Sequence, residues 1–485
     1  MYKFIVKIVS TFIILFAPLS ASEESFVEKI QLTVDALSSE KDLVWKKFDL
    51  LETPLVITFS NEHIYAFGLK KNHAAWQEKK IGNSAVLFSE KDHWNLKEIA
   101  MQDQFLLDGQ KVFVFRIDEE TNPNTFVERP ILVLVHELFH RYQFGHFERL
   151  RDVGQYADSL NIENLALIHL EERILIDFVT AEETDKLNIL KNYMAVHQAR
   201  SKIISPSSLN WEYFQQMMEG LADYASIQTF KTFPVIPGFS EKKHLFHLFS
   251  GYVHSQDPQE LAVKWRHYGV GAMVGFALDF LNVQDWKERV ETGEAQGIIL
   301  KEALALKDEE VFDRLELMKT LYGYDAIFLN IEQNVNDFEK KLENYLAAYE
   351  AEKGIVAHIG RPFDASINGG GSNYGIFHLQ DGNTMLVKDR SFSSTADNLW
   401  EIEFKDVPLF FQDKAGDRIV KVDPDLKLLV DGVSYSAKEL IETKAPLSFE
   451  SIYWDCSTSR FKSSGRTGEL YFNEEGFFVN FYKRD

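Results

Sequence analysis

The stretch ILVLVHELFHRYQFGH, residues 131–146, begins as an apolar run and ends in polar side chains. It follows Pro130, which suits the first turn of a helix because its missing N–H would be unpaired there anyway. His136 and His140 are four residues apart, so on a helix both imidazole rings lie on one face and can bind one metal ion. Glu137 is then placed to take a proton from an attacking water. This pattern predicts a hydrolytic zinc site.

The pattern H-E-x-x-H fixes three positions, and a chain with 14 histidines can match it by chance. The alternative is an ordinary helix whose two histidines are solvated or packed in a core. A zinc hydrolase also needs a third protein ligand and an open fourth position. The sequence offers two candidates for that third ligand.

The first candidate is His146, six residues after His140. The metzincins place their third histidine there, in H-E-x-x-H-x-x-G-x-x-H, where a glycine lets the chain turn back toward the metal. This chain has Gln143 at the position of that glycine. On an unbroken helix His146 would point away from the metal. A metzincin-type peptidase that uses His146 is therefore kept as the alternative.

The second candidate lies in WEYFQQMMEGLADYAS, residues 211–226, where Glu219 and Asp223 are four apart on a predicted helix. We expect Glu219 to bind the metal. Asp223 would accept the second N–H of a ligand histidine and so fix its tautomer. The alternative for Glu219 is a charged residue on a solvated helix face.

HELFH and EGLADY together resemble the gluzincins, the thermolysin-like zinc metallopeptidases with two histidines and one glutamate on the metal. The glutamate motif is similar to E-x-x-A-D of neprilysin-like enzymes and to E-G-x-A-x-Y of aminopeptidase N-like ones. HYGVGAMVGFALDFL, residues 267–281, resembles the Y-x-K-G-A segment of aminopeptidase N-like and glycyl aminopeptidase-like enzymes, where a tyrosine stabilises the oxyanion. Tyr268 would take that role, although Val270 replaces the lysine. A tyrosine packed beneath the site is the alternative.

The resemblance implies a zinc peptidase that acts on peptide or protein substrates. One zinc ion per chain would be held by His136, His140 and Glu219, with Glu137 and Tyr268 as catalytic residues and Asp223 behind the ligands. The family's exopeptidase motif G-x-M-E-N is absent from the chain. From another functional class, a non-catalytic protein that binds an envelope partner is the alternative, although a pure binder has no use for Glu137.

The family binds its substrate antiparallel to a strand upstream of the zinc helix. KVFVFRID, residues 111–118, is the candidate, since an exposed strand edge binds extended peptide. A strand buried inside the sheet is the other interpretation.

The predicted fold class is α+β, with a thermolysin-like domain of a small β-sheet and a helical lobe, followed by a separate all-β domain. Short apolar runs, PLVITFS, HIYAFGL, SAVLFSE and KVFVFRID, predict the first sheet. IFHLQ-DGN-TMLVK and ELYF-NEEG-FFVNFY predict hairpins near the C-terminus. INGGGSNYG, residues 367–375, predicts a flexible loop, since it lacks the Lys-Ser/Thr of a phosphate-binding loop. The segments are a signal peptide (1–21), an N-terminal helix and β-sheet lobe (22–125), a helical lobe (126–353) and a C-terminal β domain (354–485).

A chain of 485 residues is too long for one core and predicts two or three domains. Its 52 basic and 74 acidic side chains give a net charge of -22, which disfavours nucleic acid as a partner.

Near the N-terminus, Lys3 and Lys7 precede an apolar run, residues 8–19, that is too short to span a bilayer comfortably. We expect signal-peptide cleavage after Ala21, no later membrane span, and a periplasmic or secreted protein. An uncleaved anchor is the alternative. The lone cysteine, Cys456, excludes an internal disulfide.

Overall fold

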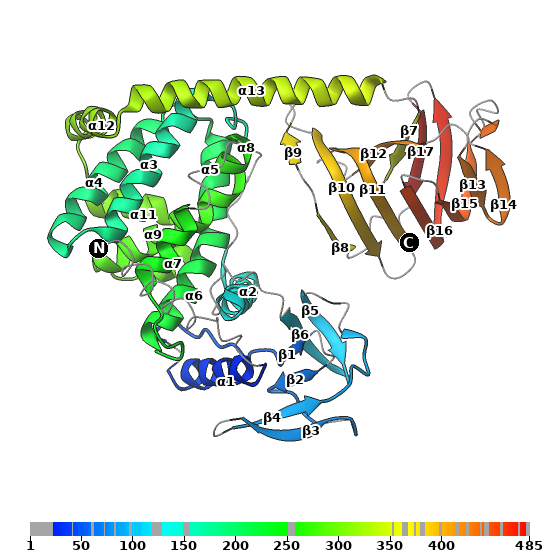
Figure 1. Cartoon of the computed structure of the whole chain (residues 1–485), viewed down its shortest axis with the longest axis horizontal. Helices are drawn as coiled ribbons and strands as arrows, with labels where there is room; N and C mark the ends of the chain where they lie inside the picture. The colour runs from blue at the N-terminus through cyan, green and yellow to red at the C-terminus, as the bar shows by residue number, and fades with distance from the viewer. Residues whose placement is uncertain are drawn as a thin grey trace, which may run out of the picture. The chain divides into compact units, whose positions relative to one another are not determined.

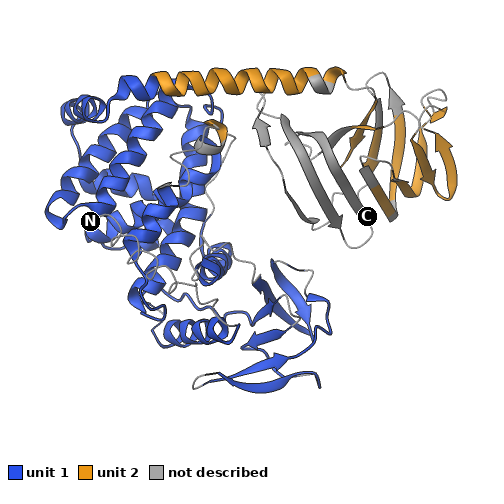
Figure 2. Cartoon of the chain, in the orientation of Figure 1, with its two compact units in different colours: residues 1–256, 260–328 blue, residues 257–259, 329–485 orange. Residues whose placement is uncertain are grey.

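The computed structural model divides the chain into two compact units (Figure 2). One holds Met1–Gln256 and Glu260–Phe328, and the other holds Asp257–Gln259 and Leu329–Asp485. The signal peptide predicted for residues 1–21 and Cys456 lie outside the described residues. The described residues are 23–40, 42–59, 63–71, 73–81, 84–96, 99, 101–117, 129–148, 156–250, 258–351, 354–360, 367–372, 375–378, 384–396, 400–412, 417–422, 426–436, 439–440, 446–455, 459–473 and 476–481.

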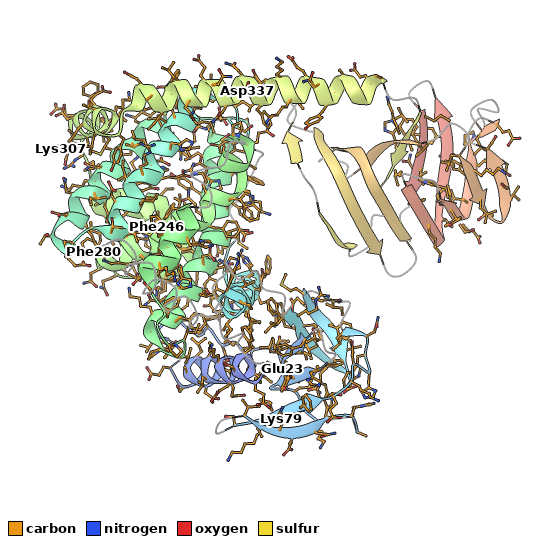
Figure 3. All side chains as sticks on the ribbon, viewed as in Figure 1. Glu23, Lys79, Phe246, Phe280, Lys307 and Asp337 are labelled. Carbon is orange, nitrogen blue, oxygen red and sulfur yellow. The ribbon has the colours of Figure 1, made fainter. Side chains whose placement is uncertain are left out.

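The first unit begins with helix α1 (Glu23–Ser39) and a six-stranded sheet in the order β3-β4-β2-β1-β6-β5 (Figure 1). β1 and β6 are parallel, and the other neighbours are antiparallel. Ion pairs hold α1 to the sheet: Lys79 on β3 lies 2.9 Å from Glu24, near the labelled Glu23 (Figure 3). The strands are β1 (Leu55–Phe59), β2 (Ile64–Phe67), β3 (Gln77–Ile81), β4 (Ser84–Ser89), β5 (Met101–Leu107) and β6 (Gln110–Ile117).

The four strands predicted from apolar runs form as β1, β2, β4 and β6. β3 (QEKKI) and β5 (MQDQFLL) were not predicted, because most of their side chains are polar and face solvent. The sheet therefore holds two strands that its apolar pattern does not reveal.

Of the two interpretations of KVFVFRID, the exposed edge strand is wrong and the strand buried inside the sheet is confirmed. β6 pairs with β1 on one side, through Leu55 and Phe113, and with β5 on the other, through Val112 and Phe105. Its continuous buried run from Val112 to Phe115 is typical of a strand covered on both faces. The edge on this side of the sheet belongs to β5.

The rest of the first unit is helical (Figure 1). Helix α2, which carries the H-E-x-x-H motif, packs against α6. The helical elements are α2 (Arg129–His146), α3 (Ile162–Thr180), α4 (Glu183–Arg200), α5 (Pro206–Gln215), the π-helix η2 (Gln216–Gly220), α6 (Leu221–Thr232), α7 (Glu241–Ser250), α8 (Pro258–Glu260), the π-helix η3 (Leu261–Trp265), α9 (Arg266–Phe280), α10 (Trp286–Glu291), α11 (Gln296–Leu304) and α12 (Asp308–Tyr322). Pro258 and Gln259 of α8 belong to the second unit. Helix α13 (Tyr324–Ala351) follows and continues into the second unit.

Two glycines bring η2 against α9. A Cβ added to Gly220 would lie 2.4 Å from the Cα of Gly271. A Cβ added to Gly271 would lie 2.4 Å from the carbonyl oxygen of Gln216. Because no side chain fits between these backbones, the contact fixes the distance between the segment that carries Glu219 and the helix that carries Tyr268.

A buried network of charges joins four helices behind this contact. Arg200 of α4 binds Glu171 of α3 at 2.8 Å and Glu212 of α5 at 2.5 Å. Arg266 of α9 binds Glu171 at 2.7 Å. Burial alone would raise the pKa of Glu171, but Arg200, His197 and Arg266 lower it to about 2. Such a network is costly to break, because removing one partner leaves a buried charge uncompensated.

The second unit is built on an eleven-stranded sheet, counted over the described residues, in the order β14-β13-β15-β16-β17-β7-β12-β11-β10-β8, with β9 beside β10. β16 also pairs with β11, so β16, β17, β7, β12 and β11 form a closed circuit. The strands are β7 (Ile355–Ile359), β8 (Ile367–Ser372), β9 (Gly375–His378), β10 (Thr384–Ala396), β11 (Trp400–Gln412), β12 (Asp417–Val422), β13 (Lys427–Val430), β14 (Val433–Ser436), β15 (Leu447–Asp455), β16 (Ser459–Asn473) and β17 (Gly476–Phe481).

The α+β fold class and a β-rich C-terminal region are thus present. Both predicted hairpins form antiparallel pairs, with His378 opposite Met385 and Gly476 opposite Asn473. The prediction of a flexible loop over residues 367–375 is wrong for its first part, because Ile367–Ser372 pairs with β10 as β8. Pairing partners supplied by β10 override the weak strand propensity of three consecutive glycines.

Candidate metal centre

The three predicted metal ligands come together in the first unit. Helix α2 presents His136 and His140 on one face, and η2 brings Glu219 opposite them. The Oε2 atom of Glu219 lies 3.4 Å from Nε2 of His136 and 3.3 Å from Nε2 of His140. Among the described residues this is the one group of three or more histidine, cysteine or acidic side chains whose ligand atoms all lie within 4.8 Å of one another.

These distances fit a zinc ion. Ligand atoms at about 2.0–2.1 Å from a tetrahedral zinc are separated by about 3.4 Å from one another. The two distances from Glu219 match that value. Two imidazole nitrogens and one carboxylate leave a fourth position open, as in hydrolytic zinc sites.

The second ring nitrogen of His136 is fixed by Asp223. Nδ1 donates a hydrogen bond of 2.8 Å to Oδ1 of this aspartate, one turn beyond Glu219 on α6. Because a carboxylate can only accept, Nδ1 carries a proton, and Nε2 is the nitrogen that a metal can bind. The predicted placement of Asp223 behind a ligand histidine is therefore present in the structure.

The second ring nitrogen of His140 is fixed by Gln143, which sequence reasoning missed. Nδ1 of His140 donates to Oε1 of Gln143 at 2.8 Å. The amide nitrogen of Gln143 donates to the carbonyl oxygens of Met217 and Met218, at 2.8 and 3.0 Å. Gln143 is fully buried, and it links one ligand helix to the segment that carries the third ligand. Its spacing of three residues after His140 was the available signal.

The charges of the cluster favour a bound cation. Burial would lower the pKa of His136, but Asp223, Glu219 and Glu137 raise it to about 10. Burial would raise the pKa of Glu219, but the two histidines lower it well below its usual range. The site therefore holds a carboxylate and attracts a positive charge, which a proton or a metal ion can supply.

The structure does not bring His146 to this group. Helix α2 continues unbroken to His146, whose Nδ1 donates 2.9 Å to the carbonyl oxygen of Tyr142. Its ring stacks on that of Tyr142, with centroids 4.1 Å apart. Because the helix does not bend at Gln143, the side chain of His146 stays at the C-terminal end of α2, away from His136 and His140.

Glu137 borders two cavities, one beside His136 and the other beside His140 and Glu219. The first has a volume of about 290 Å³ and is bordered by His136, Asp223 and Tyr268 as well. The second has a volume of about 300 Å³ and is bordered by His140 and Glu219. A chain that crosses the ligands would therefore pass Glu137 with room for a side chain on both sides.

Tyr268 lies beside the ligands. Its ring is parallel to that of His136, within 5°, with centroids 5.9 Å apart. The side chain is partly buried and borders the first cavity, next to Trp265. This position agrees with both interpretations of Tyr268, as a tyrosine packed beneath the site and as a residue that stabilises the oxyanion. The ring packs on His136 and also faces the cavity.

The edge strand β5 forms a wall of the second cavity through Met101, Gln102 and Asp103. The strand bulges between Gln102 and Phe105, with Gln104 at a φ of 53°. Asp103 binds the Nε atom of Arg141 at 2.8 Å, one residue beyond His140. This ion pair attaches the edge strand to the helix that carries the two histidines.

Comparison of the chain with protein-family models, with curated proteins and with solved structures finds no match. In the part of the chain that the structure describes, no helix has the length and apolar character needed to cross a bilayer.

Proposed function

We propose that this protein is a zinc-dependent metallopeptidase of the gluzincin type, with a thermolysin-like catalytic domain. The observation that carries the proposal is the position of Glu219, whose Oε2 lies at nearly equal distances, 3.4 and 3.3 Å, from His136 and His140. Asp223 and Gln143 accept hydrogen bonds from Nδ1 of the two histidines, so that Nε2 of each ring faces the position of the metal. Three ligands that are held this way leave room for a substrate oxygen.

Zinc in such a site lowers the pKa of water and polarises a carbonyl group. Glu137, which borders both cavities beside the ligands, takes the proton from the attacking water and passes it to the leaving amine. The hydroxyl of Tyr268 donates a hydrogen bond to the carbonyl oxygen as negative charge develops there. His136 and His140 cannot serve as the base, because their outer nitrogens are already engaged.

Peptides are the substrate class that the surroundings favour. An extended chain can pair with the free edge of β5, which borders the second cavity with Glu137, and then cross the ligands into the first cavity. The bulge at Asp103–Gln104 limits this pairing to the start of β5. Space on both sides of the ligands supports cleavage within a chain as well as at its ends.

An exported location belongs to the same proposal. The basic and apolar pattern at the N-terminus, followed by small residues, is typical of a signal peptide. N-terminal sequencing of the mature protein tests this, with Ser22 expected as the first residue. A retained Met1 or Tyr2 would favour a membrane anchor.

The decisive experiment combines metal content with cleavage of peptides by wild type, Glu137→Gln and Glu219→Ala. Glu137→Gln should keep zinc and lose hydrolysis by about a hundredfold or more, because only the proton acceptor is removed. Glu219→Ala should lose both zinc and activity. Equal activity in wild type and Glu137→Gln would disprove the proposed mechanism.

A further inference from the structure

The first cavity combines apolar walls with an arginine, Arg129, that the proposed hydrolysis does not use. Its walls are largely apolar, formed by Leu132 and Val133 of α2, Ile227 of α6 and Leu248 of α7. Arg129, the first residue of α2, stands at its border with His247. The volume of about 290 Å³ is at the lower end of the range for small-ligand sites.

Arg129 is the permanent cation of this cavity, and no ion pair joins it to a carboxylate among the described residues. It lies close enough to His247 to lower the pKa of that imidazole, together with burial and His244. In a chain with a net charge of -22, a cation that faces this cavity and has no carboxylate partner in the described part of the chain is a position where an anionic ligand can bind.

The second cavity differs. Its arginine, Arg141, already binds Asp103 at 2.8 Å, and Glu219 borders it in addition to Glu137, which borders both cavities. An acidic group there would meet negative charge. In the first cavity, Asp223 is engaged by His136, and Arg129 precedes Glu137 by eight residues. At 1.5 Å per residue this separation is about 12 Å along the helix, so an anion at Arg129 lies away from Glu137.

We infer that the first cavity binds an acidic side chain of the substrate, a glutamate or aspartate next to the scissile bond, with its carboxylate on Arg129. The methylene groups of that side chain contact Leu132, Val133 and Ile227, while the charge reaches the arginine. This inference rests on the proposed peptidase function and adds a substrate class to it. It also assigns the preference to one side of the scissile bond, because the second cavity disfavours acidic groups.

The test uses peptides of one sequence that carry glutamate, glutamine, leucine or lysine at one position beside the scissile bond, in two series, one for each side. With zinc-loaded wild type, kcat/KM for the glutamate peptide should exceed that for glutamine by about tenfold in one series and not in the other. Arg129→Glu should reverse the order, with lysine above glutamate. Arg129→Lys should retain the preference in part, since it keeps the charge.

Lys242→Glu is the matched control. It makes the same change in net charge on an exposed position of α7 that does not border the cavity, so the peptide order should stay that of wild type. Circular dichroism and zinc content show whether each variant is folded. Equal rates for glutamate and glutamine peptides in both series of wild type, or an unchanged order in Arg129→Glu, would overturn the inference.

A second readout separates this inference from the proposed function. Zinc-loaded Glu137→Gln should bind the labelled glutamate peptide more tightly than the glutamine peptide in fluorescence anisotropy, whether or not wild type cleaves either one. If wild type cleaves no peptide but this binding difference exists and vanishes in Glu137→Gln/Arg129→Glu, the peptidase proposal fails and the anion site stands. If wild type cleaves peptides without any preference for an acidic side chain, the peptidase proposal stands and the anion site fails.

Discussion

Gln143 accepts a hydrogen bond from Nδ1 of His140 at 2.8 Å, and its amide nitrogen binds the backbone just before Glu219. One side chain thus sets the tautomer of the second histidine and the position of the segment that carries the carboxylate ligand. Asp223 performs the first of these tasks for His136. The two ligand histidines therefore have different partners, one charged and one neutral.

We expect Gln143→Ala to reduce zinc affinity about ten- to a hundredfold, as removal of a partner behind a metal ligand commonly does. Gln143→Glu should retain more affinity, since its carboxylate still accepts from His140, although it cannot donate to Met217. Competition with a chromophoric chelator measures both variants. The absorption spectrum of the Co²⁺-substituted protein should change in Gln143→Ala, which a loss of stability alone would not cause. An affinity equal to wild type would contradict the role of Gln143.

Glu219 and His146, the two candidates for the third ligand, predict opposite effects of their alanine variants on zinc content. Glu219→Ala should abolish tight zinc binding, because two histidines alone rarely hold the ion. His146→Ala should leave zinc content near one per chain, since its Nδ1 is engaged with the backbone of its own helix. Metal analysis after dialysis against a weak chelator compares the two. Loss of zinc in His146→Ala with retention in Glu219→Ala would remove the present ligand assignment.

Local patterns were enough to predict much of the candidate site. His136, Glu137 and His140 follow from helix periodicity, because residues four apart share a face. Glu219 and Asp223 follow from a second short motif on another helix. That these two motifs lie 3.3–3.4 Å apart at the ligand atoms is a tertiary fact that no local pattern contains.

The parts that escaped prediction depend on tertiary pairing. MQDQFLL lacks the alternation of a half-buried strand, since a bulge shifts its register between Gln102 and Phe105. Because the pattern does not reveal β5, KVFVFRID is the last apolar strand before the zinc helix in the sequence, and the pattern alone leaves open whether it is the edge or a buried strand. The glycine-rich strand β8 was missed for a related reason, because its partner β10 and not its own propensity makes it a strand.

Gly271→Ala should disturb the site from a distance. Its added Cβ would lie 2.4 Å from the carbonyl oxygen of Gln216, so η2 must move. Overpacking of this kind costs about 1–3 kcal/mol of unfolding free energy. We also expect weaker zinc binding, because Glu219 moves with η2. Gly145→Ala on the exposed end of α2 is the control, with no atom within 4 Å of the added Cβ. Urea unfolding and zinc titration of both variants test this, and equal zinc affinities would disprove the link.

Glu172 should make the folded state less stable as pH rises. Its carboxyl is fully buried in α3, and neither oxygen has a hydrogen-bond partner among the described residues. Burial raises its pKa to about 7, against the opposing charge of Arg266, while Glu171 raises it further. Between the unfolded pKa near 4.5 and the folded value, the unfolded chain releases a proton that the folded chain keeps. Stability from this group is therefore complete below pH 4.5 and lost as pH rises through 7.

The measurement compares urea unfolding of wild type and Glu172→Gln from pH 4.5 to 8. The amide stays neutral, so the variant should gain stability relative to wild type as pH rises, by at most about 3 kcal/mol across this window. The change with pH is the readout, because any constant cost of the substitution cancels in it. Glu163→Gln, at an exposed position of the same helix, should follow the wild-type profile. A constant difference between Glu172→Gln and wild type at every pH would mean that Glu172 is ionised in the folded protein throughout, and that its burial is compensated by a partner.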